Sequence, residues 1–522
     1  MSVSNRVWWW LIPVPLITAT LSIHALDSDV LWVDEFSSIA DIGAIHHTLF
    51  NPSQIIDMVK TYRPQHIPAY YFVLAGWSAL VGWEPFALRA LSLFFGLLTV
   101  CFTYRLGRDW LSPRTGVYAA ALLGTNAFFI YFAHELRMYT MLTFFVAFSL
   151  WVYRRIITMR TAPGLKMWIV LWVAAFGLLG SHVYGALIFA VLAAYHLFFV
   201  PRTRRWTGTW AVFATAVLPF VPWIQVIMRS AQGVSHTEAL RADALPPASI
   251  IWWIGYLFGN GMIALVVVLA IFAVVGLRIY HRATREVWFL TIAAFIFTLM
   301  ANAFVPMITV RRVRYLVHLW PLLALLAGVG LTNITRLTGQ GAASIIMTGL
   351  VITGIGNTFN AGFLEDMDGP LHVQQSIPMP QIMRTLTHFA HPDDMIVLIS
   401  QQNRIFVASE FGPSIAEYYL SNYDYLEQKP IELPGWRTHD EVRQYLLDDG
   451  SLNLNAWFAY ESDIAPETLA EYRDILAERY TFCGSAFDSP EYRIDRYDLA
   501  TFGCIEQHTD APPVATFENN IT

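Results

Sequence analysis

The sequence predicts a polytopic α-helical membrane protein that carries a small C-terminal α/β domain outside the cytoplasm. Of its 522 residues, 56% are hydrophobic and only 14% are charged, and the mean hydropathy is +0.46, whereas a typical soluble protein has about 25% charged residues. Residues 1–360 hold 24 Lys and Arg against 12 Asp and Glu, and residues 361–522 hold 9 against 27. We therefore predict a transmembrane module over 1–360 and a soluble domain over 361–522. The net charge of −6 gives no basis for nucleic-acid binding through counterion release.

Apolar stretches long enough to cross about 30 Å of hydrocarbon recur through the first 360 residues. The pair between Lys166 and Arg202 could form one tilted helix, but Gly180, Ser181 and His182 favour a break. The first stretch could be a cleaved signal peptide, but the lack of a small-x-small cleavage site favours a retained helix. The stretches predict eleven transmembrane helices, at 7–26, 86–104, 115–133, 138–153, 167–181, 183–200, 207–228, 260–280, 287–305, 315–332 and 342–360.

The distribution of Lys and Arg between the short loops predicts the orientation. With a cytoplasmic N-terminus, the inner loops contain fifteen of these residues and the outer loops eight, which agrees with the positive-inside rule. Residues 64–83 could span the membrane, but counting them would reverse this agreement, so we predict an interfacial or re-entrant helix within an outer loop at 27–85. Eleven crossings of a plasma (inner) membrane then place the C-terminal domain outside the cytoplasm.

The C-terminal domain has the pattern of a small α/β unit. We expect strands at 395–400 and 456–460, helices around 410–420 and 466–479, and a strand pair at 492–499. Cys483 and Cys504 flank that pair and could form a disulfide in an oxidising compartment, whereas Cys101 lies in a predicted span and is expected to be a small core residue. The cysteine spacing indicates no structural zinc site.

Two groups of carboxylates lie on the predicted outer face. Asp34 and Glu35 follow the first span in the segment LWVDEFSSI, where partial desolvation would make a carboxylate a stronger base; the alternative is an ordinary solvated loop. Glu135 lies with Arg137 and Tyr139 in the turn HELRMY. This second group could form a structural ion pair, or it could place a second carboxylate opposite Asp34 across a cavity.

Cationic side chains on the same face are candidates for binding an anion. Arg63 and His66 stand in YRPQHIPAYY beside a long apolar run, although an aromatic belt with one arginine anchor would also explain this segment. One arginine side chain can bind two phosphate oxygens at once, so the segment RRVRY could hold an anionic lipid headgroup. The alternative is nonspecific attraction of these arginines to lipid. His182 and Tyr184 are weaker candidates, with a structural role as the alternative. The residues of RRVRY concerned are Arg311, Arg312, Arg314 and Tyr315.

These motifs together resemble a known family. The acidic pair after the first span, the P-x-H-x-P-x-YY segment, FALRALS at 86–92, the H-E-x-R-M-Y turn and R-Y-L-x-x-x-x-P at 314–321 are similar in order and spacing to the polytopic GT-C glycosyltransferases. Within that superfamily they resemble glycosyltransferase family 39, the dolichyl-phosphate-mannose mannosyltransferases, and the aminoarabinose transferases. The resemblance covers residues 1–360.

The resemblance implies an inverting glycosyltransferase that takes a monosaccharide from a polyprenyl-phosphate donor on the extracytoplasmic face. It implies that Asp34 is the general base on the acceptor hydroxyl, with Glu35 beside it as a positioning or alternative carboxylate. Glu135 would be a further active-site carboxylate, and Arg137 would orient it or contact the phosphate. The arginines of RRVRY would hold the leaving polyprenyl phosphate. A guanidinium group suits this role, because the leaving phosphate gains negative charge, whereas the acceptor needs a base within hydrogen-bond reach.

Several features limit what the resemblance implies. The chain has YRPQHIP where many relatives have H-P-P-L-Y-Y, its tail does not resemble a β-trefoil, and it lacks the W-W-D-Y-G block of oligosaccharyltransferases. The acceptor is therefore left open among a lipid, a glycan and a protein, and a divalent metal is compatible with the sequence but not required. The rival hypothesis is a membrane transporter or lipid flippase, a class in which internal repeats and broken helices are common; the sequence shows no convincing repeat.

Overall fold

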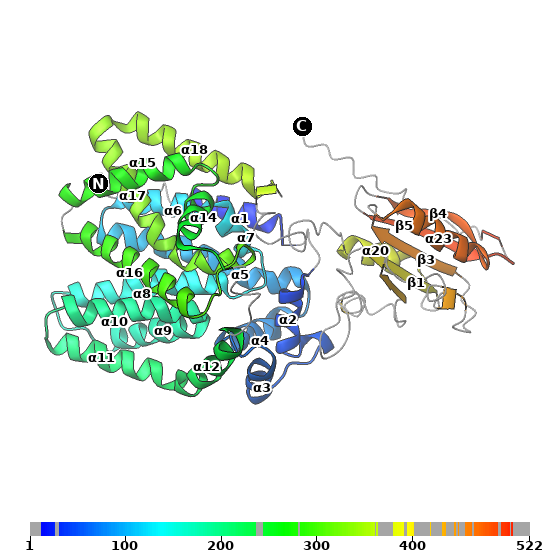
Figure 1. The fold of residues 1–522 in the computed structure, drawn as a ribbon, viewed down its shortest axis with the longest axis horizontal. Coiled ribbons are helices and arrows are strands. Elements are labelled where there is room, and N and C mark those ends of the chain that lie inside the picture. Colours follow the sequence, from blue (N-terminus) through cyan, green and yellow to red (C-terminus); the bar gives the residue numbers. More distant parts are fainter. Residues whose placement is uncertain are drawn as a thin grey trace. The chain divides into compact units, whose positions relative to one another are not determined.

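The chain divides into two compact units in a computed structural model (Figure 1). The first comprises residues 1–26 and 41–374, and the second comprises residues 27–40 and 375–522. Residues 27–40 of the predicted outer loop therefore group with the C-terminal residues. The structure describes residues 12–26, 31–235, 244–279, 282–360, 362–363, 379–390, 394–400, 418, 431–434, 443–444, 447, 455–461, 464–488, 492–501 and 503–504.

The first unit is helical throughout its described residues, apart from short connections. Three short 3₁₀ segments interrupt the α-helices: η3 (Ala44–His46), η4 (Leu218–Phe220) and η5 (Val310–Leu319). The α-helices that lie within this unit are α1 (Pro13–Ile23), α3 (Pro52–Tyr62), α4 (Ala69–Val81), α5 (Pro85–Trp110), α6 (Pro113–Gly124), α7 (Ala127–Ala133), α8 (Tyr139–Thr158), α9 (Leu165–Ser181), α10 (Val183–Phe199), α11 (Arg204–Val217), α12 (Val221–Ser235), α14 (Pro247–Phe258), α15 (Ile263–Ile279), α16 (Arg282–Phe304), α17 (Trp320–Thr338) and α18 (Gln340–Thr358).

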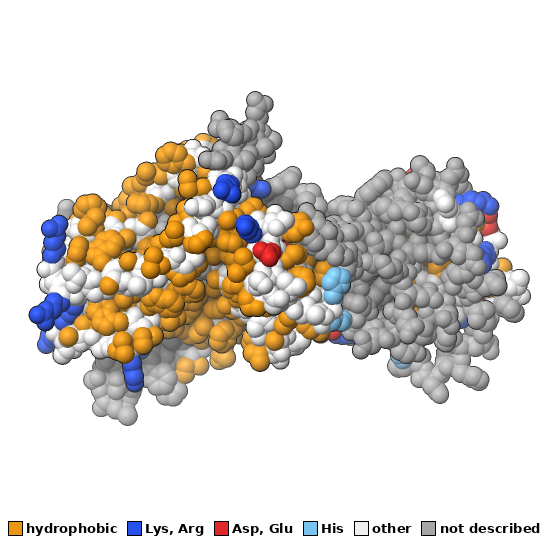
Figure 2. Space-filling model, turned by 90° about the horizontal axis from the view of Figure 1, so that it is seen from below, with side chains coloured by type: hydrophobic (Ala, Val, Ile, Leu, Met, Phe, Trp, Pro, Cys, Tyr) orange, Lys and Arg blue, Asp and Glu red, His pale blue; other side chains and the backbone are white. Residues whose placement is uncertain are grey.

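The helices confirm an integral membrane protein. Among the described residues, six helical stretches are long and apolar enough to cross a membrane, and two bent pairs also qualify when each is taken as one span. Four shorter apolar helices, α1, α4, α9 and α10, accompany them, and the predicted total of eleven crossings stays a prediction. Hydrophobic side chains cover most of the visible face of this unit (Figure 2), as a surface in contact with lipid tails requires.

Individual predictions for the spans had different outcomes. The break at His182 is confirmed, because α9 ends at Ser181 and α10 begins at Val183. The predicted span over 115–133 corresponds to α6 and α7, which pass as one span only when taken together and meet at a bend of 67° that the sequence did not predict. Helix α14 was missed, and it meets α15 at 97°. The 13 residues of α4 extend for about 20 Å, which is short of the hydrocarbon thickness and fits an interfacial helix.

Both bends are filled by one group of buried amides. Asn126 caps the start of α7 by accepting a hydrogen bond from the Phe129 N–H at 3.0 Å, and its Oδ1 also accepts from Trp320 Nε1 at 2.8 Å. Its amide nitrogen donates to the Asn260 side chain at 3.0 Å and to the carbonyl oxygens of residues 257 and 258 at the end of α14. Sequence hydropathy missed the break at Asn126, because a single polar residue there satisfies the backbone groups that the bend exposes.

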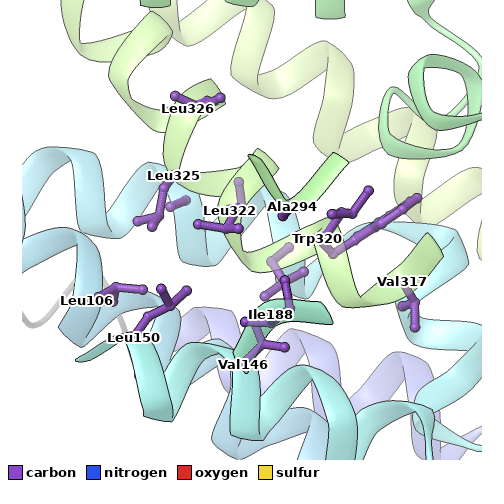
Figure 3. Close-up of a cluster of buried hydrophobic side chains, with 14 of the residues drawn as sticks. Leu106, Val146, Leu150, Ile188, Ala294, Val317, Trp320, Leu322, Leu325 and Leu326 are labelled. Carbon is purple, nitrogen blue, oxygen red and sulfur yellow. The ribbon is translucent and has the colours of Figure 1, made fainter. Parts of the chain in front are cut away.

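Helix α17 lies at the centre of the hydrophobic core. Its side chains pack with those of α5, α8 and α16 around Trp320, Leu322 and Leu325 (Figure 3). Close helix contacts depend on small residues: a Cβ atom on Gly107 would lie 2.7 Å from the Cα of Gly116, so α5 and α6 approach each other at these glycines. Such close approach is how helices gain van der Waals packing in a membrane.

A buried carboxylate joins three helix ends on the predicted cytoplasmic side. Glu286 of α16 accepts a hydrogen bond from Trp110 Nε1 at 3.1 Å and pairs with Arg154 and, at 3.0 Å, with Arg282 Nε. Trp110 ends α5 and Arg154 lies in the last turns of α8. The group therefore fastens the ends of α5, α8 and α16 to one another.

The second unit contains a five-stranded sheet with the strand order β2-β1-β3-β5-β4. Strand β1 is parallel to β2 and β3, whereas β5 is antiparallel to β3 and β4. Side chains of α23 pack on the sheet face that bears Val397 and Phe458, and Phe389 of α20 stacks on Trp457, which alternates with Phe458 along its strand. The elements are α20 (Met379–Phe389), β1 (Met395–Ser400), β2 (Ile431–Pro434), β3 (Asn455–Glu461), α23 (Pro466–Ala477), β4 (Tyr480–Asp488), β5 (Tyr492–Leu499) and α2 (Val33–Asp41). The last residue of α2, Asp41, belongs to the first unit.

The structure confirms most of the predicted elements of this unit. The strands at 395–400 and 456–460 and the helix from 466 correspond to β1, β3 and α23. Apart from Tyr418, the predicted helix around 410–420 lies outside the described residues. The prediction of a strand pair within 492–499 was wrong, because these residues form the single strand β5, whose neighbours are β3 and β4. A disulfide joins Cys483 to Cys504.

Candidate functional site

A buried histidine lies in the short segment between α3 and α4. Pro64 and Pro68 restrict the backbone on either side of His66, and its N–H donates to the Arg63 carbonyl at 2.8 Å. The imidazole Nδ1 lies 2.7 Å from the hydroxyl of Tyr71, which lies in the first turn of α4. Trp223 Nε1 donates to the His66 carbonyl at 2.7 Å. The His66 main chain is thus held by its own segment and by α12, and its ring contacts α4.

Four ionisable residues interact electrostatically with His66 and affect its pKa. Burial lowers the pKa of His66 well below its usual value, and electrostatic interactions with Arg137, His182, Arg63 and Arg314 lower it further. The imidazole is therefore neutral at physiological pH. The same positive potential that keeps a proton off His66 would stabilise an anion at this place. The structure thus brings together residues of three predicted motifs that are far apart in the sequence.

Aromatic rings form one side of this region. His182 lies at the break between α9 and α10, and its ring centroid is 5.3 Å from that of Tyr315 and 5.5 Å from that of Tyr184. Tyr139 lies 6.1 Å from His182, and His318 lies 5.2 Å from Tyr184. Burial, followed by nearby His318, Arg137 and Arg314, lowers the pKa of His182 to about 3. We call these five residues the ring cluster.

His182 also has a local structural role. Its Nδ1 accepts a hydrogen bond from the Tyr184 N–H at 3.2 Å and so caps the start of α10. The alternatives of a structural role and a site role for this histidine are therefore compatible, because the capping ring also belongs to the ring cluster.

The arginines of RRVRY lie in η5, directly before α17. The charge of Arg314 acts on both His66 and His182, whereas the charge of Arg312 acts on Tyr184. The backbone is non-helical at Arg312 (φ −123°, ψ 18°), so successive arginines do not follow one helical face. The side chain of Arg311 lies outside the described part of the chain. Tyr315 carries its ring into the ring cluster.

The turn between α7 and α8 is buried. Glu135 and Arg137 are 4% and 3% exposed, which is far too little for a solvated loop. The Arg137 N–H donates to the Glu135 carbonyl at 2.7 Å, and Ser92 of α5 donates from its hydroxyl to the Arg137 carbonyl at 3.3 Å. The turn is therefore fixed against α5, with Arg137 near His66.

The predicted acidic pair lies in the first turn of α2, in the second unit. The Glu35 carboxylate accepts a hydrogen bond from the Trp32 N–H at 3.4 Å, and Glu35 is 1% exposed. Acidic side chains in a first helical turn interact favourably with the helix dipole. The next residue, Phe36, packs edge-on against Tyr418, with ring centroids 5.9 Å apart. The predicted pairing of Asp34 with Glu135 across a cavity stays a prediction.

Asp41 is a further residue of this region that was not predicted from the sequence. This residue is fully buried, and its Oδ2 lies 3.8 Å from Arg63 Nε. The available signal was an acid inside the apolar segment SSIADIGAI, because an ionisable residue in such surroundings is a functional candidate by default. Tyr71 and His318 were missed as well. Within the described residues, no group of three or more His, Cys, Asp and Glu side chains is arranged to hold a metal ion.

Comparisons with known proteins agree with this architecture. Residues 64–227 match the family model described as dolichyl-phosphate-mannose-protein mannosyltransferase, and a comparison with curated proteins found no match. The structure is similar to ArnT from Cupriavidus metallidurans in the apo state, with 14% identity, coverage of 95% of this chain and 99% of that chain, and a TM-score of 0.52. It is also similar to ArnT bound to undecaprenyl phosphate, with 13% identity, coverage of 96% and 100%, and a TM-score of 0.50. At identities this low, the structural similarity shows a shared fold alone.

Proposed function

Because this protein has the fold of the polytopic GT-C glycosyltransferase superfamily, we propose that it transfers a monosaccharide from a polyprenyl-phosphate donor to an acceptor hydroxyl. The observation that carries the proposal is the convergence of Arg63, Arg137 and Arg314 on one buried, neutral histidine. A site with this potential suits a phosphate group. The ArnT relative bound to undecaprenyl phosphate supports the choice of a lipid-linked phosphate.

The proposed reaction uses the cations for the leaving group and a carboxylate for the acceptor. The acceptor oxygen attacks the anomeric carbon, the bond from that carbon to the phosphate oxygen breaks, and the configuration inverts. The bonding electrons leave with the polyprenyl phosphate, which changes from a singly charged diester to a more highly charged monoester. Arginine side chains that are already in place stabilise this additional charge without further reorganisation.

Asp34 is the proposed general base, which takes the proton of the acceptor hydroxyl. Glu35 is proposed to position Asp34, and Glu135 is proposed to act as a second active-site carboxylate. Arg311, Arg312, Arg314 and Tyr315 are proposed to hold the leaving polyprenyl phosphate together with Arg63, His66 and Arg137. Tyr139, His182 and Tyr184 would form the adjoining wall, where aromatic rings could pack against the donor.

The proposed location is the extracytoplasmic face of the plasma (inner) membrane. The disulfide between Cys483 and Cys504 supports an oxidising compartment for the C-terminal unit. The acceptor class stays open among a lipid, a glycan and a protein.

One observation supports the transporter hypothesis. Two helix pairs are bent, α6 with α7 and α14 with α15. Broken helices near mid-membrane are common at transport sites, where they line a cavity. Here the breaks are filled by Asn126 and Asn260, which are 0% and 4% exposed and hydrogen-bonded to each other. The breaks are therefore closed by side chains, and the transferase proposal is favoured.

Transfer of radiolabelled sugar from a panel of polyprenyl-phosphate sugars by the purified full chain tests the proposal. The wild type is expected to transfer or release sugar, Asp34→Asn to bind donor without transfer, and Arg137→Gln to lose donor binding. Arg204→Gln, an exposed arginine at the start of α11, is the matched control and should behave as the wild type. Failure of the wild type to bind or use any donor would refute the proposed function; full activity of Asp34→Asn would refute only the role of that base.

A further inference from the structure

We infer that Asp41 is a positioning residue that holds the Arg63 guanidinium at the donor-phosphate site. The inference rests on the proposed function and adds to it a carboxylate that acts through another side chain. The Asp41 side chain is 0% exposed, and its Oδ2 lies 3.8 Å from Arg63 Nε. The Arg63 side chain is 26% exposed. The buried member of the pair is therefore the carboxylate, and the partly exposed member is the cation.

The position of Asp41 is unfavourable for a purely local role. Burial of a carboxylate costs several kcal/mol unless a cation compensates it. Asp41 is also the last residue of α2, where the helix dipole disfavours negative charge. Arg63 supplies the compensating charge, so the carboxylate and the guanidinium each restrict where the other can lie.

Arg63 is connected to the site on its main-chain side as well. Its carbonyl accepts the hydrogen bond from the His66 N–H at 2.8 Å, and the Tyr71 hydroxyl that contacts His66 lies within the electrostatic reach of Asp41, Arg63 and Arg137. A long arginine side chain loses substantial rotamer freedom when it is ordered. Asp41 restricts this freedom before donor binding, so less binding energy is lost when Arg63 meets a phosphate oxygen.

A merely structural ion pair would behave differently from a positioning pair. Loss of a structural pair lowers thermal stability but leaves donor affinity unchanged in the variants that fold. Loss of a positioning pair weakens the binding of the phosphate donor, and it does so only while Arg63 is present. A double-mutant cycle between the two residues therefore distinguishes the roles.

The test measures the KM for the donor, kcat, and the Kd for the matching polyprenyl phosphate without sugar, on the purified full chain. Asp41→Asn and Arg63→Ala are each expected to weaken polyprenyl-phosphate binding about tenfold, because charge-assisted phosphate contacts are the strong ones. The double variant should bind no worse than Arg63→Ala alone. Asp41→Glu, which keeps the charge, should recover most of the affinity. Asp57→Asn on the neighbouring exposed face of α3 is the matched control.

The outcomes separate this inference from the proposed function. A wild type that binds and transfers, together with an Asp41→Asn variant of unchanged Kd, would overturn the inference and leave the function standing. Arg63→Ala tests the same contact from its partly exposed side, so wild-type affinity in that variant overturns the inference even if the Asp41 variants do not fold. Additive losses in the double variant would also overturn it. A wild type with no donor activity or binding would remove the proposed function itself.

Discussion

Replacement of Asn126 by alanine should destabilise the helical unit strongly, because this one side chain forms hydrogen bonds at both helix bends and with Trp320 of the central helix α17. The amide makes five hydrogen bonds of 2.8–3.2 Å. Asn260 Oδ1 keeps the Ala127 N–H as a donor at 3.0 Å after the change, but Trp320 Nε1 and the Phe129 N–H lose their acceptor. A buried polar group without a partner costs about 1–3 kcal/mol, and side-chain hydrogen bonds in membrane proteins lie at the low end. We therefore expect a loss of about 2–4 kcal/mol, from these two donors.

Thermal unfolding of the detergent-purified full chain, followed by circular dichroism, measures this loss. The matched control is Asn51→Ala, which removes the exposed cap of α3 and should cost about 1 kcal/mol. In a Trp320→Phe background, which has no indole N–H, the cost of Asn126→Ala should fall by about 1 kcal/mol. Equal losses in Asn126→Ala and Asn51→Ala, or an unchanged cost in the Trp320→Phe background, would show that this reasoning is wrong.

Three further predictions concern other parts of the chain. Glu286→Gln removes the carboxylate that pairs with Arg154 and Arg282, and the same unfolding assay should show a loss of about 3 kcal/mol, whereas a loss similar to that of Asn51→Ala would contradict a fastening role. His182 has a folded-state pKa of about 3, so below its unfolded pKa of about 6.5 the unfolded state takes up the proton. Stability should thus fall from pH 7 to pH 5 by about 2 kcal/mol more in the wild type than in His182→Gln; parallel pH curves would refute this. Cys483→Ser opens a disulfide with a sequence separation of 21 and should cost about 3 kcal/mol, seen as a lower midpoint for unfolding of the C-terminal unit; insensitivity of the wild type to reductant would count against it.

Much of the architecture could be predicted because its signals are local. The long apolar stretches indicate membrane helices whatever their neighbours are, since backbone groups in lipid must be satisfied within the helix. The strand at 395–400 and the helix from 466 were likewise visible as short apolar or periodic segments. The helix break at Asn126 was missed, because an asparagine has the same local effect on hydropathy whether or not it ends a helix, and helix α14 before Asn260 was missed as well.

The candidate site shows the same division. The sequence by itself determined which residue types were unusual for an outer membrane face: the acidic pair at 34–35, His66, Arg137, His182 and the arginines at 311–314. Only the tertiary structure decided that Arg137, His182 and Arg314 act together on His66. It alone decided that Asp41 lies against Arg63, because electrostatic interaction depends on distance and burial. Sequence fixes neither quantity for residues on different helices, so their chemistry appears only once the helices pack.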